Sequence, residues 1–215
     1  MSCLHVNNFS DAIFYRARAR ERADEGCECR TAVPIARCEC RTAGIVKGAI
    51  MINFIIRPVE KTDLDAVTAV EAICFPAAEA ATRESFEQRI AAFPECFFVA
   101  EYEGNIIGFI NGCVTDERTI RDEMFEDSSL HNPNGCYQSI FGLDVIPEYQ
   151  RQGIAAELMN HLIADAKDKG RKGLILTCKD RLIHYYAKFG YKNLGVSASV
   201  HGGAVWYDML LEFEV

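Results

Sequence analysis

The segment that most restricts the fold is an apolar strand pattern that passes through a short turn into a long amphipathic helix. The strand pattern covers residues 137–146, and the helix pattern runs from Gly153 to Lys169. The apolar residues of the helix fall on one stripe at the 3.6-residue spacing of a helix with one buried face: Ala155, Leu158, Met159, Leu162, Ile163 and Ala166. A strand that leads directly into such a helix predicts an α/β fold, in which helices cover a sheet.

The same alternation of strand and helix patterns continues on both sides of this segment. Strand patterns cover residues 53–57, 97–102, 105–114, 173–178, 191–194 and 204–213. Helix patterns follow Thr62, Thr82 and Asp180, which are suitable N-cap residues, and residues 116–127 predict a short exposed helix. We therefore expect a mixed α/β (α+β) sheet of six to seven strands in the order β-α-α-β-β-(α)-β-α-β-α-β-β.

The first fifty residues differ from the rest because they show no sustained period of 3.6 or 2.0 residues. The string Cys-Glu-Cys-Arg-Thr-Ala occurs there twice, at residues 27–32 and 38–43. We expect residues 1–50 to be a poorly ordered appendage and residues 51–215 to form the working domain. A zinc site on the four duplicated cysteines is the alternative, although structural zinc ligands usually have two to four residues between paired cysteines.

Composition and targeting signals favour an ordinary cytoplasmic protein. The chain is 49% hydrophobic, and its longest apolar stretch, residues 43–56, is interrupted by Lys47 and shorter than the ~20 residues of a membrane-spanning helix. No membrane partner is therefore expected. Because no basic start precedes an apolar segment at the N-terminus, we expect the ten cysteines to be reduced thiols in the cytoplasm.

The charge distribution disfavours nucleic acid as a partner. Residues 1–50 hold 8 lysines and arginines against 6 aspartates and glutamates, which leaves 15 against 25, a net charge of −10, for residues 51–215. Nucleic-acid binding draws most of its affinity from neutralising phosphates with basic side chains. An acidic body instead attracts a cationic partner such as an amine.

The turn at Gly153 is a candidate phosphate site. A helix N-terminus presents unpaired backbone N–H groups and a partial positive charge, and glycine lets the backbone approach an anion closely. The sequence fits neither the phosphate loop with Gly-Lys-Ser/Thr nor the three-glycine dinucleotide motif. From this turn alone, a pyrophosphate site and an ordinary strand-to-helix connection remain equal alternatives.

Two motifs together resemble one known family. Gln150-x-x-Gly153-x-Ala155 after Leu143-Asp144-Val145 is similar to the acetyl-CoA loop of the GNAT superfamily of N-acetyltransferases. The segment from Tyr185 to Tyr191, which ends in an aromatic-Gly-aromatic turn, resembles a later helix motif of that superfamily. The likeness covers residues 52–213 and looks closest to the arylalkylamine N-acetyltransferase branch and its microbial relatives, through residues 105–112, 116–118, 131–135 and 176–182.

The resemblance implies a V-splayed sheet that binds acetyl-CoA without a metal. The pantetheine arm would lie between the strands ending at Val145 and Cys178, and the domain 51–215 would be an acetyltransferase. The implied cofactor contacts are Leu143, Asp144, Val145, Gln150, Arg151, Gln152, Gly153, Ile154, Ala155 and Ala156. Dimers are frequent in this superfamily, so a homodimer is compatible with the resemblance.

The resemblance also implies roles in catalysis. Tyr186 matches the family's proton donor, and a phenol is protonated at neutral pH and can donate to the departing thiolate. Ser139 and Phe141 stand where the animal enzymes carry a histidine pair, so we expect a base relayed by water held by Ser139, Gln138 or an acidic side chain. Phe75 and Glu79 lie in the segment that matches the acceptor loop, and with Phe141 they are the candidate substrate-binding residues. Glu79 is also the candidate for the acidic side chain that assists proton removal, and it is equally compatible with a solvated role.

The predicted function is direct acetyl transfer from acetyl-CoA to a small, cationic primary amine. Two alternatives remain: a peptide N-terminus as the acceptor, or an acyl-CoA sensor with little turnover. The sensor alternative is motivated by the absent histidine pair.

Overall fold

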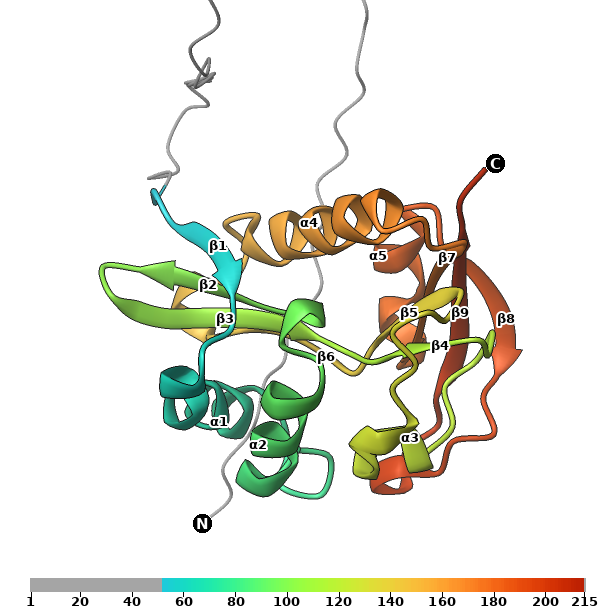
Figure 1. The fold of residues 1–215 in the computed structure, drawn as a ribbon, viewed down its shortest axis with the longest axis horizontal. Coiled ribbons are helices and arrows are strands. Elements are labelled where there is room, and N and C mark those ends of the chain that lie inside the picture. The colour runs from blue at the N-terminus through green and yellow to red at the C-terminus, as the bar shows by residue number, and fades with distance from the viewer. Residues whose placement is uncertain (1–51, 215) are drawn as a thin grey trace, which may run out of the picture. The chain divides into compact units, whose positions relative to one another are not determined.

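The computed structural model describes residues 52–214, in which the strands form two sheets flanked by helices (Figure 1). The strands are β1 Ile55–Pro58, β2 Phe97–Tyr102, β3 Asn105–Asn111, β4 Val114–Thr115, β5 Tyr137–Ile140, β6 Gly142–Val145, β7 Gly173–Cys178, β8 Lys192–Val196 and β9 Tyr207–Glu212. The α-helices are α1 Leu64–Cys74, α2 Arg83–Ala92, α3 Glu123–Glu126, α4 Ile154–Asp168 and α5 Ile183–Ala187. These elements follow the predicted order of strands and helices.

One sheet has the order β1-β2-β3-β6, and the other has the order β4-β5-β7-β9-β8. The pair β5 and β7 is parallel, whereas the other paired strands are antiparallel. The mixed sheet predicted from the sequence is thereby confirmed, but it is divided into two.

The division occurs where two predicted strands each break in the middle. The pattern 105–114 separates into β3 and β4 at Gly112, and the pattern 137–146 separates into β5 and β6 at Phe141. The breaks face each other, because Phe141 N–H donates to Asn111 O at 2.7 Å. A Cβ on Gly112 would lie 2.0 Å from Ser139 O, so only glycine permits this close approach.

The helices cover opposite faces of the sheets, with α4 and α5 on one side and α1 and α2 on the other (Figure 1). The predicted stripe of α4 is buried as expected, and Leu158, Met159 and Leu162 are fully enclosed. These residues pack with Leu176, Cys178 and Met209 into the largest apolar cluster, which we call the α4-side core. On the other side, Val67, Phe86 and Phe109 belong to the core beneath α1 and α2.

Local capping agrees with the sequence at α2 and differs at α1 and α5. The prediction of Asp180 as a helix N-cap is wrong, because Asp180 begins a 3-10 helix, Asp180–Leu182, and α5 starts only at Ile183. Thr82 caps α2 as predicted, since its hydroxyl accepts a hydrogen bond from Ser85 N–H at 3.1 Å. The prediction of Thr62 as the N-cap of α1 is wrong: Thr62 lies in a short 3-10 helix, Lys61–Asp63, and α1 begins at Leu64. The carboxylate of Asp63 instead accepts from Glu60 N–H, which makes this turn a capping box.

Residues 116–127 contain only the four-residue helix α3, Glu123–Glu126, rather than a longer exposed helix. Between residues 52 and 214, no helix combines the length and apolar character needed to cross a membrane. The predictions for residues 1–50, including the appendage and the duplicated Cys-x-Cys segment, lie outside the described residues.

Candidate active site

The strands β6 and β7 belong to different sheets, and of the two only β7 has a partner strand on each side. β6 pairs with β3 alone, so among residues 52–214 its second edge has no strand partner. Ile146 N–H donates to Ile107 O at 3.0 Å. Since backbone groups alternate along an antiparallel strand, Leu143 and Val145 direct their N–H groups toward the unpaired edge. An extended polar ligand could use these groups for hydrogen bonds, as the sequence predicts for pantetheine.

The turn that follows β6 brings backbone N–H groups to the start of α4. Arg151 has a φ of 61° and Gly153 a φ of 89°, so two residues of this turn adopt the left-handed conformation. For an arginine this conformation is uncommon, and such residues concentrate at functional sites. Gln150 Nε2 donates to Val145 O at 2.9 Å and thereby closes the turn onto the end of β6.

No side chain caps the first turn of α4, whose N-cap residue is Gly153. The turn residues Gln150, Arg151, Gln152 and Gly153 are exposed. Ile154 is buried beneath the turn, and Ala155 and Ala156 are half-buried. The exposed turn and the helix dipole therefore offer an environment that is suited to an anion, and they follow directly on β6.

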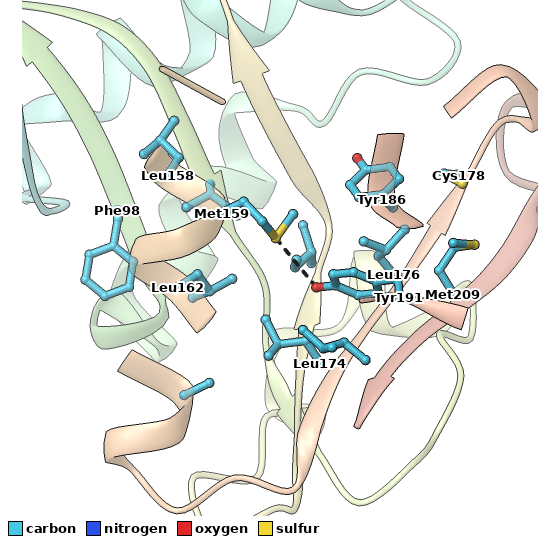
Figure 2. Close-up of a cluster of buried hydrophobic side chains, with 14 of the residues drawn as sticks. Phe98, Leu158, Met159, Leu162, Leu174, Leu176, Cys178, Tyr186, Tyr191 and Met209 are labelled. Atoms are coloured by element: carbon cyan, nitrogen blue, oxygen red, sulfur yellow. Dashed lines mark hydrogen bonds between the residues drawn. The ribbon is translucent and has the colours of Figure 1, made fainter. Parts of the chain in front are cut away.

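Tyr186 lies on α5 in the α4-side core, beside the end of β7 (Figure 2). Burial, together with the nearby Cys178, raises the pKa of the Tyr186 phenol well above its usual value. Burial also raises the pKa of the Cys178 thiol to about 12, which keeps it protonated and a poor nucleophile. Both groups therefore hold their protons at neutral pH.

The two neighbouring tyrosines of this core differ in what their hydroxyls contact. Tyr191 O–H donates to Met159 Sδ at 3.6 Å, and Figure 2 shows the Tyr186 hydroxyl pointing away from that contact. Within residues 52–214, no hydrogen bond engages the Tyr186 hydroxyl. Tyr186 is thus the buried phenol whose proton is available to a ligand.

Ser139 and Phe141, which stand where the animal enzymes carry a histidine pair, have different surroundings. Ser139 is fully buried, and its hydroxyl donates to Cys113 O at 2.8 Å across the β4 and β5 pair. Phe141 is half-buried on the opposite face from the α4-side core, where its ring lies 4.9 Å from the Arg89 guanidinium and 5.0 Å from the Phe125 ring. The Ser139 hydroxyl is therefore occupied by a backbone carbonyl.

The segment predicted to form the acceptor loop follows α1 and is tied to the other sheet. Phe75 is half-buried at the end of α1, where its N–H donates to Glu71 O. The Glu79 carboxylate accepts from Lys179 Nζ through both oxygens, at 2.7 and 2.8 Å. His201 Nε2 lies 3.0 Å from Glu79 O. Glu79 is thus part of an ion pair that joins this loop to the end of β7, instead of a solvated carboxylate.

The structure adds a buried charged cluster that the sequence analysis missed. Glu71 on α1, Arg89 on α2 and Asp144 on β6 are 5%, 6% and 3% exposed. Burial and the adjacent Glu71 raise the pKa of Asp144 well above its usual value, and burial likewise raises the pKa of Glu71. Burial lowers the pKa of Arg89 to about 10, so its guanidinium is still charged. Arg89 therefore contributes a buried positive charge near the Glu71 carboxyl.

Three atoms of this region remain without hydrogen-bond partners among residues 52–214: Glu71 Oε2, Asp144 Oδ2 and Asn111 Nδ2. The helical spacing of Glu71 behind Val67 and Val70 was a usable signal, because it places a carboxylate on the buried face of α1. Across the described part of the chain, no three histidine, cysteine, aspartate or glutamate side chains are grouped as metal ligands.

Comparison with known proteins gives one family. The sequence profile of the acetyltransferase (GNAT) family matches residues 64–191. "Probable hydrolase YhcX" of Bacillus subtilis is 31% identical over 145 residues, which are 63% of this chain and 28% of that protein. Serotonin N-acetyltransferase of Mesocricetus auratus is 26% identical over 108 residues, 50% of this chain and 51% of that protein. The chain thus spans between about a quarter and a half of these relatives.

Among solved structures, the GphF GNAT-like decarboxylase in complex with isobutyryl-CoA superposes with a TM-score of 0.65 at 22% identity. The superposition covers 74% of this chain and 98% of that one, which supports the fold.

Proposed function

Because the chain belongs to the GNAT family of acetyltransferases, we propose that it transfers an acetyl group from acetyl-CoA to a small primary amine. The membership predicted from the Gln150 to Ala155 turn and the Tyr185 to Tyr191 segment is confirmed, whereas the arylalkylamine branch remains a prediction. We also propose that residues 51–215 form the working domain.

The observation that carries this proposal is the unpaired edge of β6 leading into the uncapped N-terminus of α4. The edge presents N–H groups of Leu143 and Val145 to an extended amide-bearing arm. The turn residues Arg151, Gln152 and Gly153 and the first-turn residues Ile154, Ala155 and Ala156 present N–H groups to a pyrophosphate, whereas Gln150 N–H donates to Pro147 O. The shape and charge of these groups fit acetyl-CoA, which supplies the acetyl thioester when bound.

Within this proposal, Tyr186 is the proton donor. Its phenol holds a proton at neutral pH, its hydroxyl has no competing partner among the described residues, and it lies beside the end of β7. A proton placed there can be given to the sulfur as the thiolate leaves. Ser139 is less suited to relay a proton because Cys113 O already engages its hydroxyl.

The ion pair between Glu79 and Lys179 favours a small acceptor. It joins the loop after α1 to the end of β7, and both side chains are largely removed from solvent, with 10% and 28% exposure. An extended peptide entering from this side would have to displace the pair. A compact amine would not, which supports a small molecule over a peptide N-terminus.

The test is incubation of the purified full chain with acetyl-CoA and a pool of aryl-alkylamines, polyamines, aminoglycosides, amino acids and short peptides. Products are detected by mass spectrometry, because ten thiols interfere with a thiol dye. We expect an acetylated amine from the small-molecule members. Tight acetyl-CoA binding without any acetylated product would favour an acyl-CoA sensor, and failure to bind acetyl-CoA would refute the proposal.

A further inference from the structure

The carboxylate of Asp208 on β9 lies on the face opposite the α4-side core, near the end of β7. Along β9, Met209 belongs to the α4-side core and Leu210 to the opposite cluster, so the side chains alternate between the two faces. Asp208 therefore lies on the same face as Leu210. The register places Asp208 directly opposite Thr177 of β7, one residue before the end of that strand.

Asp208 is half-buried, and one of its two carboxylate oxygens has no hydrogen-bond donor in the described part of the chain. Its Oδ1 atom is enclosed by protein and has no hydrogen-bond partner among residues 52–214. No ion pair with Asp208 occurs in that part of the chain. Burial raises the pKa of Asp208, an effect that the Ser197 hydroxyl partly offsets. A buried carboxylate oxygen without a donor is costly, and a ligand carrying N–H groups would remove that cost.

The groups around Asp208 are suited to a cation. Lys179, two residues after Thr177, donates hydrogen bonds from Nζ to both carboxylate oxygens of Glu79, so its positive charge is neutralised. Trp206, two residues before Asp208, donates from Nε1 to His201 O at 2.9 Å. The His201 ring in turn lies 5.1 Å from the ring of Phe125. The Lys179 ammonium also lies 5.5 Å from the centre of the Trp206 ring, so this ring already contacts a cation through its face.

We propose that Asp208 binds the ammonium group of the acceptor amine and takes its proton. This inference rests on the acetyl transfer proposed above and names the residue that selects the acceptor. The Asp208 carboxylate accepts one proton from the ammonium group, and the freed nitrogen lone pair forms the bond to the acetyl carbon. The carbon–sulfur bond breaks, its electron pair stays on sulfur, and the thiolate takes the proton of Tyr186. The nitrogen then loses its second proton to solvent, Asp208 releases its proton to solvent, and solvent returns a proton to Tyr186.

The experiment separates binding from turnover. Binding of phenethylamine, protonated at neutral pH, and of its uncharged analogue 2-phenylethanol to the CoA-loaded full chain is measured by ligand-observed NMR. The same measurement is made on Asp208→Asn, on Asp208→Glu and on the exposed control Asp168→Asn. Acetyl-CoA affinity, melting temperature, and kcat and KM for phenethylamine are recorded for each protein.

We expect the wild type to bind phenethylamine more tightly than 2-phenylethanol. Asp208→Asn should raise KM for the amine by about 10- to 100-fold, the range for a lost hydrogen bond to a charged group, and lower kcat. It should leave acetyl-CoA affinity and 2-phenylethanol binding unchanged. Asp208→Glu should recover part of the loss, and Asp168→Asn should match the wild type.

Other results overturn the inference or the proposed function separately. Equal wild-type binding of amine and alcohol, or none of the amine, overturns the inference without using any variant. Amine acetylation that Asp208→Asn leaves unchanged overturns the inference while the proposed function stands. Ammonium binding that depends on Asp208 but leads to no acetylation supports the ammonium site and refutes acetyl transfer.

Discussion

The two faces of the divided sheet differ in the kind of group that each offers to a ligand. On the side of α4 and α5, the side chains are mainly apolar, and the polar groups are backbone N–H groups at the β6 edge and the α4 N-terminus. On the opposite side, the polar groups are side chains: Glu71, Arg89 and Asp144 are buried, and Asp208 is half-buried with its Oδ1 atom enclosed.

This difference teaches how the two substrates of the proposed reaction can be recognised independently. Backbone groups fit a ligand whose polar parts are constant, such as the pantetheine and pyrophosphate of CoA. Side chains can be exchanged one at a time, so a face built from them can select among acceptors. The predictions below test whether each face acts alone, from the largest expected effect to the smallest.

Tyr186→Phe should lower kcat by about 10²- to 10⁴-fold, because the proton for the leaving thiolate is removed while the ring continues to fill the core. Acetyl-CoA affinity, measured by calorimetry, should stay within a factor of about 3. Tyr185→Phe is the matched control, since this neighbouring ring lies 5.3 Å away and should leave kcat unchanged. Equal losses in both variants would contradict the role of Tyr186.

Arg89→Met should lower the free energy of unfolding by about 3 kcal/mol, because it leaves Glu71 and Asp144 without their buried positive charge and Phe125 O without its 2.8 Å donor. Chemical denaturation measures the change. Arg83→Met on the same helix is the control, since Arg83 is half exposed in its ion pair with Asp65 and should cost about 0.5 kcal/mol or less. Similar values for the two variants would show that the charged cluster is not a unit.

Asp144→Asn should make stability less sensitive to a rise in pH above about 4. The folded-state pKa of Asp144 is raised, so the stability that comes from its protonated carboxyl is complete below pH about 4 and is lost as pH rises through the raised value. The loss approaches about 1.4 kcal/mol per pH unit for one proton. Denaturation of wild type and variant from pH 4 to 9 should therefore diverge in favour of the variant at high pH, whereas exposed Asp168→Asn should follow the wild type.

Gly153→Ala should cost about 1 kcal/mol of stability, because a side chain at φ 89° is strained, and should weaken acetyl-CoA binding several-fold. Gly170→Ala at the other end of α4 is a close control: its φ is 71°, and neither position has an atom within 4 Å of an added Cβ. The two variants should lose similar stability, but only Gly153→Ala should lose affinity in calorimetry. A loss of affinity in both would place the effect in the helix as a whole.

The same contrast explains how far the sequence could predict this molecule. The stripe of α4 and the turn at Gly153 are local patterns. The order of helices and strands along the chain and the buried face of α4 were therefore predictable from neighbouring residues. The breaks at Gly112 and Phe141 were missed because each strand changes its pairing partner there, and the partner is set by distant parts of the chain.

The acceptor face was less predictable, because its residues meet only after folding. Glu71, Arg89 and Asp144 lie on three separate elements, and Asp144 is one of a run predicted to contact the cofactor. Glu79 was predicted as a base or a solvated residue because its partner, Lys179, is 100 residues away. Ser139 was a reasonable relay until its bond to Cys113 O was known.

The central claim is that the two faces bind the two substrates separately, and backbone amide NMR of the full chain with successive ligands tests it most directly. Addition of CoA should shift the amides of residues 143–145 and 150–156, and later addition of phenethylamine should shift those of Thr177, Trp206 and Asp208. Shifts of the same amides by both ligands, or CoA shifts confined to the α1 and α2 face, would contradict the account.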